Sequence, residues 1–470
     1  MIEKSLYMLA EVSLLLGMIT LFLQKSLTEV SVKGYFKTTK IAVLLSALGS
    51  VLFYNKEVFP SLFEVSTYTV MFYVLTCAIV FAWLSLSVKW FVSEDRSPFR
   101  FCELSLLALF SFNIIIKSID LSVLFLGLST LGVVNYYFLK FSQESEEFHN
   151  ISTRYALTTS FFAVMMALAM FILTPDNWNY VNLAEFIGIS EIHISMFVVV
   201  AILFFVLFLW GAAPLHFCFA DVVAPAVLPV AAYLNLVPVF VLFAAFVRLN
   251  ANPFLPVASE LDLIYSIFGG ISLIVGAIGA NSSRNLRKIF AYTGVYNLGI
   301  LLLLVSPFTP QSLLNSFIYL QVYILALFGV YTSFYSFKSG GNYLANLNMI
   351  NGIAKVRPFI SAAMLFFMVS IMGIAPLPGF IAQLTALETF AVESSYFIIF
   401  MVLFALVILM AAYLQIIRSM YFNKREVEFN RPDYGVYVYL FINMVLVAIL
   451  IFKPQFLLYD AANILNVVLK

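Results

Sequence analysis

One pentapeptide, Gly-x-Ala-Pro-Leu, occurs twice in the chain, at residues 211–215 and 373–377, and each copy interrupts a long apolar run. In a membrane helix, proline frees a backbone carbonyl and glycine exposes the backbone, so such a break persists only where protein or a water-filled cavity satisfies the freed groups. Paired interrupted helices are typical of membrane transporters built from inverted repeats, although five matching residues can also recur by chance in so apolar a chain. The expected helix breaks are marked by Gly211, Pro214, Gly373, Pro376 and Pro378.

The composition excludes an ordinary soluble domain. Of 470 residues, 63% are hydrophobic and 10% are charged, whereas soluble domains have about 45–50% and about 25%. The apolar runs are about 17–25 residues long, as helices that cross a bilayer require, and lack the short alternating segments of a barrel. The sequence therefore predicts one all-α integral membrane domain with about 14 transmembrane helices.

The distribution of basic residues sets the orientation of these helices. We expect spans near residues 5–24, 38–54, 67–88, 101–116, 121–138, 156–174, 194–220, 227–249, 263–280, 286–306, 315–337, 358–391, 395–420 and 435–452, of which the seventh and the twelfth are broken. Most of the 25 Lys and Arg residues then fall in the odd-numbered loops. Cytoplasmic loops carry this excess, so both termini are expected outside. The expected location is a bacterial plasma membrane (inner membrane), crossed many times, with both termini periplasmic.

The two broken helices lie five spans apart, which is an odd number. Copies of a unit displaced by an odd number of spans face opposite ways across the membrane. We therefore predict two inverted five-helix repeats, helices 4–8 and 9–13. The expected divisions of the single membrane domain, residues 1–470, are 1–100 for helices 1–3, 101–249 for the first repeat, 263–420 for the second repeat and 421–470 for the C-terminal helix.

Several classes of function have no support in the sequence. A net charge of +1 without a basic cluster gives no reason to expect nucleic acid. Cys77, Cys102 and Cys218 lie far apart, without the close spacing that zinc or an iron–sulfur cluster needs. The three His residues form no paired ligand set. We expect no metal, no cofactor and no catalytic redox residue in this chain.

Short motifs across nearly the whole chain resemble those of one family. The stretch from Pro214-Leu-His216 to Arg248-Leu249 is similar to the "PFH, PDV, TPV, RL" signature of the N subunit (subunit 2) of respiratory complex I, an antiporter-like membrane-arm family. Residues 373–380, GIAPLPGF, are similar to the family's "GIPPTAGF". Further matches are Ala10-Glu11, Phe125-Leu-Gly127, Asp221-Val222, Leu228-Pro229-Val230, Asn285-Leu-Arg-Lys288 with Tyr292, and Asn297-Leu-Gly299.

The resemblance implies a membrane-arm subunit of a complex I type NADH:quinone oxidoreductase that contributes to redox-driven proton translocation. Such a subunit is non-catalytic, and the FMN, iron–sulfur clusters and quinone are expected in other subunits. Its partners would be the other membrane-arm subunits, antiporter-like and small, together with lipid. Two alternatives stay open: a structural spacer in the same arm, or an antiporter-like subunit of a related cation antiporter or membrane-bound hydrogenase.

The chain departs from the family at four positions that carry buried charges. The helix-five glutamate position matches Ser129, and the lysine positions in helices seven, eight and twelve match Leu209, Val239 and Gln383. Burial brings lysine and glutamate into a useful titration range, whereas none of these four residues exchanges protons near neutral pH. Local proton conduction is therefore expected to be weak, rerouted or lost.

Other polar residues are candidates for a substitute proton path. Glu388 follows Gln383 in broken helix twelve and is either a buried proton carrier or a carboxylate that reaches water at the helix end. His216 either relays protons or satisfies carbonyls freed by Pro214. Glu11 either carries protons or contacts a neighbouring helix or subunit. Asn235, Asn297, Gln321 and Gln383 either line a water file or join helices, and Arg287 and Lys288 either admit protons or anchor the helix.

Overall fold

The computed structural model confirms an all-α membrane protein. Among the described residues, 13 helices are long and apolar enough to cross a membrane, or up to 14 if the bent pair Leu347–Val356 and Pro358–Ile371 counts as one span. The strands in the described part of the chain are two short antiparallel ones of two residues each, Lys338–Ser339 and Asn342–Tyr343. The structure describes residues 8–27, 30–54, 59, 61–94, 96–142, 146–173, 192–251, 253–339, 342–424, 428–430 and 434–452.

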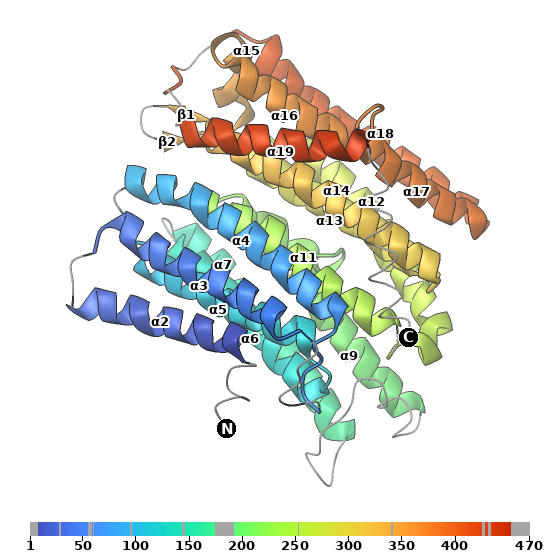
Figure 1. The fold of residues 1–470 in the computed structure, drawn as a ribbon. Helices are drawn as coiled ribbons and strands as arrows, with labels where there is room; N and C mark the ends of the chain where they lie inside the picture. The colour runs from blue at the N-terminus through green and yellow to red at the C-terminus, as the bar shows by residue number, and fades with distance from the viewer. Residues whose placement is uncertain are drawn as a thin grey trace. The chain divides into compact units, whose positions relative to one another are not determined.

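The chain divides into two compact units. The first, unit 1, comprises the described residues up to Trp210 together with Val237–Val257. Helices that follow one another in the sequence pack side by side in it, as α2 does with α3 and α5 does with α6 (Figure 1). Its elements are α2 (Leu9–Leu27), α3 (Val32–Leu52), α4 (Thr67–Glu94), α5 (Phe99–Lys117), α6 (Leu121–Phe141), α7 (Glu146–Leu173), α9 (Ile192–Trp210), the second half of α11 (Leu228–Ala251) and η2 (Leu255–Val257).

Unit 2 comprises Gly211–Leu236 and the described residues from Ala258 onward. In it α12 packs along α13 and α18, while α14 contacts α16, α17 and α19. Its elements are η1 (Leu215–Cys218), α10 (Phe219–Val223), the first half of α11, α12 (Ala258–Ser282), α13 (Leu286–Val305), α14 (Pro310–Phe334), β1 (Lys338–Ser339), β2 (Asn342–Tyr343), η3 (Leu347–Ile350), α15 (Ile353–Val356), α16 (Pro358–Ile371), α17 (Pro378–Val392), α18 (Tyr396–Tyr421) and α19 (Tyr434–Phe452).

Side-chain caps set where several of these helices begin. Asp120 precedes α6, and its carboxylate accepts hydrogen bonds from the backbone N–H groups of Ser122 and Val123. Asn285 caps α13 in the same way. Thr309 and Ser312 cap α14 reciprocally, and Pro310 occupies its first turn. Such caps satisfy backbone donors that have no partner inside the helix.

The observed helices agree with the expected spans in number and order, with longer helices at several ends. Helix α3 begins at Val32 instead of near residue 38, and α7 begins at Glu146 instead of near residue 156. Because the residues at these ends are polar, the sequence predicted loops there. The structure shows that they are helical, since a helix can extend beyond the hydrocarbon core of the membrane. The predicted repeat bounds stay a prediction, since the compact units divide the chain at Gly211, inside the first expected repeat.

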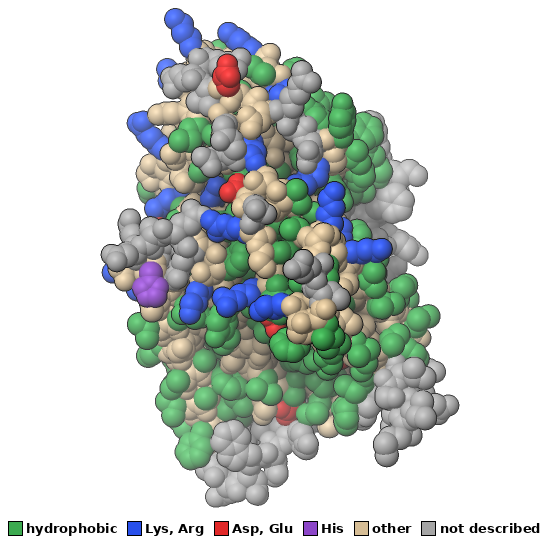
Figure 2. All heavy atoms as spheres, turned by 90° about the vertical axis from the view of Figure 1, so that its left-hand side faces the viewer, with side chains coloured by type: hydrophobic (Ala, Val, Ile, Leu, Met, Phe, Trp, Pro, Cys, Tyr) green, Lys and Arg blue, Asp and Glu red, His purple; other side chains and the backbone are tan. Residues whose placement is uncertain are grey.

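Figure 2 shows many Lys and Arg side chains, and few acidic ones, on the side that lies to the left in Figure 1. In unit 1, Lys25 at the end of α2 lies 4.5 Å from the ring centroid of Phe99 at the start of α5, so two odd-numbered loops meet at one end of the bundle. This agrees with the alternation of loops used to orient the spans.

Candidate functional site

Both copies of the pentapeptide break a helix, as predicted. Gly211 and Gly373 have φ values of +84° and +68°, in the left-handed region that favours glycine. The peptide bonds Ala213–Pro214 and Ala375–Pro376 are both cis. The helix that precedes the first copy ends directly before it, at Trp210, and the helix that precedes the second copy ends one residue earlier, at Ile371. The two copies therefore share a left-handed glycine and a cis proline, and they differ at the leucine, which begins a 3₁₀-helix at Leu215 and is extended at Leu377.

Neighbouring groups within unit 2 satisfy and support the first break. The backbone N–H of Ala213 donates to Oγ of Ser272 on α12 at 2.9 Å, and this hydroxyl lies 3.4 Å from the carbonyl oxygen of Ala213. A Cβ atom at Gly211 would lie 2.7 Å from the ring of Phe219. The break is thus held by a buried hydroxyl group and closed by an aromatic ring.

At the second break the two half-helices approach each other more closely than side chains allow. A Cβ atom at Gly379, in the first turn of α17, would lie 1.6 Å from the carbonyl oxygen of Ser370 near the end of α16. A Cβ atom at Gly373 would lie 2.4 Å from Cγ of Gln383. Glycine at both positions therefore brings Gln383 against the broken end of α16.

Gln383 belongs to a buried polar cluster contributed by three helices. The hydroxyl group of Tyr319 on α14 donates to Oδ1 of Asn297 on α13 at 2.6 Å, and Nε2 of Gln383 lies 3.5 Å from the Tyr319 hydroxyl oxygen. Nδ2 of Asn297 donates to the carbonyl oxygen of Thr293 at 2.7 Å. Asn297, Tyr319 and Gln383 are 1%, 3% and 6% exposed, so this cluster joins α13, α14 and α17 in the interior of unit 2.

A small cavity of about 10 Å³ lies beside this cluster, and Asn297, Tyr319, Tyr323, Ser370 and Gln383 contribute its polar lining. The Tyr323 hydroxyl, Oγ of Ser370 and Oε1 of Gln383 are buried and have no hydrogen-bond partner among the described residues. A cavity needs about 10–15 Å³ and two to four polar partners to hold one water molecule. This cavity meets the lower limit of size and offers enough partners.

A second polar contact continues from the cavity toward the first half of α11. Nδ2 of Asn235 donates to the Tyr331 hydroxyl on α14 at 2.7 Å. Oδ1 of Asn235 and the Tyr323 hydroxyl both face Gly294, where a Cβ atom would lie 3.4 and 3.5 Å from them. Uncharged polar groups therefore run from Tyr331 through Asn235 and Tyr323 to Gln383. We call these groups, with Asn297 and Tyr319, the polar chain.

Charged residues lie at the start of α13, at the end of unit 2 where the odd-numbered loops lie. Nζ of Lys288 lies 2.8 Å from Oδ1 of Asp221 on α10, and both side chains are partly exposed. Arg287 donates from Nη1 to the carbonyl oxygen of Ala226. The half-buried His216 ring lies 6.3 Å, centroid to centroid, from Tyr292. The structure brings His216, Arg287 and Lys288 to the same part of unit 2.

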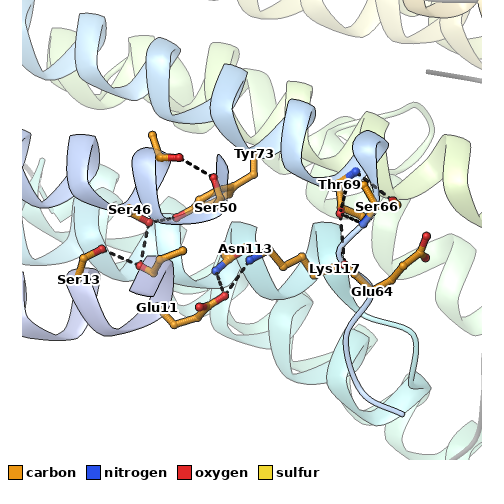
Figure 3. Close-up of polar contacts among 12 residues, drawn as sticks. Glu11, Ser13, Ser46, Ser50, Glu64, Ser66, Thr69, Tyr73, Asn113 and Lys117 are labelled. Atoms are coloured by element: carbon orange, nitrogen blue, oxygen red, sulfur yellow. Dashed lines mark hydrogen bonds and ion pairs between the residues drawn. The ribbon is translucent and has the colours of Figure 1, made fainter. Parts of the chain in front are cut away.

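Unit 1 contains a buried ion pair that the sequence analysis did not recognise. Oε1 of Glu11 on α2 lies 2.9 Å from Nζ of Lys117 on α5 and accepts a 2.6 Å hydrogen bond from Nδ2 of Asn113 (Figure 3). The Lys117 and Glu11 side chains are 7% and 20% exposed. Glu11 thus contacts a neighbouring helix, which was one of its two expected roles. Lys117 gave no sequence signal beyond its place at a helix end.

The sequence of the chain matches a known family of membrane proteins. The profile of the family described as NADH:quinone oxidoreductase/Mrp antiporter, transmembrane, matches residues 118–409, which is more than half of the chain. The chain belongs to this family. NADH-quinone oxidoreductase subunit N of Rhodospirillum rubrum is 24% identical over 350 residues, 73% of this chain and 71% of the relative. The subunit of the same name from Francisella tularensis is 25% identical over 490 residues, 98% of this chain and 99% of the relative.

Two solved structures share the fold. A chain of respiratory complex I from Thermus thermophilus superposes with a TM-score of 0.79 at 19% identity, covering 96% of this chain and 98% of that one. A chain of the archaeal membrane-bound sulfane sulfur reductase superposes with a TM-score of 0.85 at 16% identity, covering 98% of both chains. At these identities the likeness concerns the fold alone.

The family's expected charge positions can now be placed in the structure. Leu209 and Val239 are 4% and 3% exposed and belong to the apolar core of unit 1. Ser129 lies one turn before Gly132 on α6, and its hydroxyl is buried without a hydrogen-bond partner among the described residues. Gln383 is the one of the four that joins a polar cluster.

The remaining candidate residues for a substitute proton path differ in how exposed their side chains are. Glu388 on α17 is exposed on the surface of the chain, and its role in a proton path stays a prediction. It lies five positions after Gln383, about one and a half helical turns, and therefore on a different face of α17. Gln321 is half-buried, whereas Asn235 and Asn297 are buried.

Proposed function

We propose that this chain is the antiporter-like N subunit of the membrane arm of a complex I type NADH:quinone oxidoreductase. The family match supports it, as does a subunit N relative that is matched over 98% of the chain. The two helix breaks, each with a glycine in the left-handed region, support it from the structure. NADH oxidation and quinone reduction would take place in other subunits, which would hold FMN, iron–sulfur clusters and quinone.

The location follows from the same proposal. The chain is a multi-pass membrane protein, and its relatives named above are bacterial. We place it in the plasma membrane with the basic loops in the cytoplasm and both termini in the periplasm, because basic loops stay on the cytoplasmic side. Its partners would be the other membrane-arm subunits and the surrounding lipid.

The chemistry of the polar chain defines how this subunit contributes. Gln383 occupies the helix-twelve charge position, and it is buried among Tyr319, Asn297 and a cavity of about 10 Å³. An amide does not store a proton near neutral pH, but it can hydrogen-bond water that passes one. We therefore propose that the polar chain is a neutral, partly hydrated route, with Arg287, Lys288 and His216 near its entrance, and that it conducts protons weakly.

The core of unit 1 supports the same conclusion. Leu209 and Val239 place apolar side chains where a buried charge would be needed, and leucine and valine neither bind protons nor order water. The observation that carries the proposal is this difference: unit 2 keeps polar groups at its broken helix, whereas the corresponding positions of α9 and α11 in unit 1 are apolar. A purely structural spacer is the alternative, and the polar chain of unit 2 favours weak conduction over it.

Membership of the complex is tested by purification. An affinity tag on this chain in its native host should co-purify NADH oxidation coupled to quinone reduction, together with flavin and iron–sulfur absorbance. Co-purification with sodium/proton antiport activity or with hydrogenase activity, and without NADH oxidation, would assign the chain to a related complex instead.

The contribution to proton translocation is tested in the purified complex in liposomes, as protons moved per electron. We expect a ratio below that of relatives that keep all four charges, and no change with Glu388→Gln, because this side chain is exposed. Gln383→Leu should lower the ratio further if the polar chain conducts. A ratio equal to that of the charged relatives would contradict weak conduction, and an unchanged ratio in Gln383→Leu would favour the spacer.

A further inference from the structure

A pocket of about 190 Å³ lies beside the Glu11–Lys117 pair in unit 1. Glu11, Asn113 and Lys117 form its polar part, and apolar side chains from α2, α5 and the segment before α4 form its walls. Two of the wall residues, Leu15 and Phe59, are exposed, so the pocket reaches the outer surface of the unit. An engineered apolar cavity of about 150 Å³ holds a benzene molecule, so this pocket can hold a group of comparable or larger size.

The polar part of the pocket has hydrogen-bonding capacity that the protein itself does not use. Asn113 is 2% exposed, and its Oδ1 has no hydrogen-bond partner among the described residues. Asn113 and Lys117 both bond to Oε1 of Glu11, so neither contact uses the second carboxylate oxygen. A ligand that fits must donate hydrogen bonds to Asn113 and Glu11, and it gains further if it accepts one from Lys117.

The position of the pocket restricts the ligand to molecules of the membrane surface. Glu11 lies in the first turn of α2 and Lys117 in the last turn of α5, so the pocket is at the end of unit 1 opposite to the basic loops. Such helix ends lie at the level of lipid headgroups. Exposed apolar side chains continue from the pocket along α2, at Leu15, Ile19 and Phe22, with the spacing of one helix face.

We propose that this pocket binds the headgroup of an ethanolamine phospholipid. The primary ammonium group donates to Asn113 Oδ1 and to the Glu11 carboxylate, while the phosphate accepts from Lys117. One acyl chain lies along the exposed face of α2. This zwitterion matches the opposite charges of the ion pair, whereas an anionic headgroup offers no cation to the Glu11 carboxylate. The proposal depends on the chain spanning a membrane and is independent of the complex in which it works.

The test is a lipid competition on the purified full-length chain, or on the complex that contains it. The protein is delipidated, exchanged into mixed micelles with equal amounts of phosphatidylethanolamine, phosphatidylcholine and phosphatidylglycerol, and the retained lipid is identified by native mass spectrometry. Phosphatidylcholine is the matched control because its quaternary ammonium cannot donate a hydrogen bond. We expect phosphatidylethanolamine to be retained about tenfold over phosphatidylcholine, as loss of a hydrogen bond to a charged group implies. Equal retention of the two, or preference for phosphatidylglycerol, would overturn the proposal.

A pair of variants locates the binding. Asn113→Leu is close in size and removes the unpartnered acceptor while keeping the Glu11–Lys117 pair, so the preference for phosphatidylethanolamine should fall several-fold. Leu16→Ala, on the outward face of α2, serves as a control and should keep the preference. Since the wild-type competition alone decides the lipid class, an unfolded variant does not leave the proposal open. A folded Asn113→Leu protein with undiminished preference would place the lipid elsewhere.

Discussion

The hydroxyl group of Tyr319 donates a hydrogen bond of 2.6 Å to Oδ1 of Asn297, and both side chains are buried between α13 and α14. This contact fixes the tyrosine against Gln383, whose Nε2 lies 3.5 Å from the same hydroxyl oxygen. Because buried polar groups lose water on folding, a contact of this kind stabilises the packing of the helices only while both partners are present.

Loss of the Tyr319 hydroxyl should therefore destabilise the protein. Tyr319→Phe leaves Oδ1 of Asn297 buried without its donor, and we expect a loss of about 1–3 kcal/mol in the free energy of unfolding. Tyr323→Phe is the matched control, since the Tyr323 hydroxyl has no partner among the described residues, and it should cost less than about 1 kcal/mol. Thermal unfolding of both variants in detergent measures the difference. Equal destabilisation would show that the two hydroxyl groups are equally engaged.

The close approach of the half-helices at the second break makes a separate prediction. Gly379→Ala places a Cβ atom against the backbone oxygen of Ser370, which cannot move without opening the break. We expect a loss of about 3 kcal/mol or more, or failure to fold.

Gly270→Ala on α12 is the control for this substitution. Its Cβ would meet only the end of the Met401 side chain, with Cε 2.6 Å and Sδ 3.6 Å away, and that flexible side chain can rotate. The higher helix propensity of alanine partly offsets the crowding, so a change within about 1 kcal/mol is expected. Yield and melting temperature in detergent distinguish the variants. A Gly379→Ala protein as stable as Gly270→Ala would show that the break tolerates a wider separation.

The fold could be predicted from the sequence because a bilayer limits what a chain can do. Long apolar runs must be helices, and a proline with glycine inside such a run must break it. The breaks at Pro214 and Pro376 and the number of spans therefore followed from local residues. Asn297 and Gln383 could be named as polar residues inside spans, but not as partners of one tyrosine, because that contact depends on the rotation of three helices.

Contacts between segments far apart in the sequence could not be predicted from hydropathy and local motifs. Glu11 and Lys117 lie 106 residues apart, and hydropathy alone does not indicate which helix faces α2. The two expected roles of Glu388 stayed open for a related reason: apolar neighbours along α17 placed it inside a span without showing which side of the helix it occupies. The structure shows that this side is the exposed one.

Two further ion pairs should differ in strength because their surroundings differ. The Lys288–Asp221 side chains are 34% and 52% exposed, so Lys288→Met should change the free energy of unfolding by about 0–1 kcal/mol. Arg248 is 18% exposed, pairs with Glu64 at 2.7 Å and also donates to the carbonyl oxygen of Ile116. Arg248→Met should cost about 2 kcal/mol or more. Parallel melting curves compare the variants, and a larger loss for Lys288→Met would contradict this ranking.

The Glu11–Lys117 pair should show strong coupling in a double-mutant cycle. Glu11→Gln leaves the Lys117 ammonium group buried without a carboxylate, and Lys117→Met leaves the Glu11 carboxylate without a cation, so each single substitution should cost about 3 kcal/mol. The double variant removes both charges, and a well-packed neutral pair is often as stable as the ion pair it replaces. We therefore expect the double variant to unfold at a higher temperature than either single variant. Strictly additive losses would mean that solvent already screens the two charges, and that the pocket beside them is more open to water than the 7% exposure of Lys117 indicates.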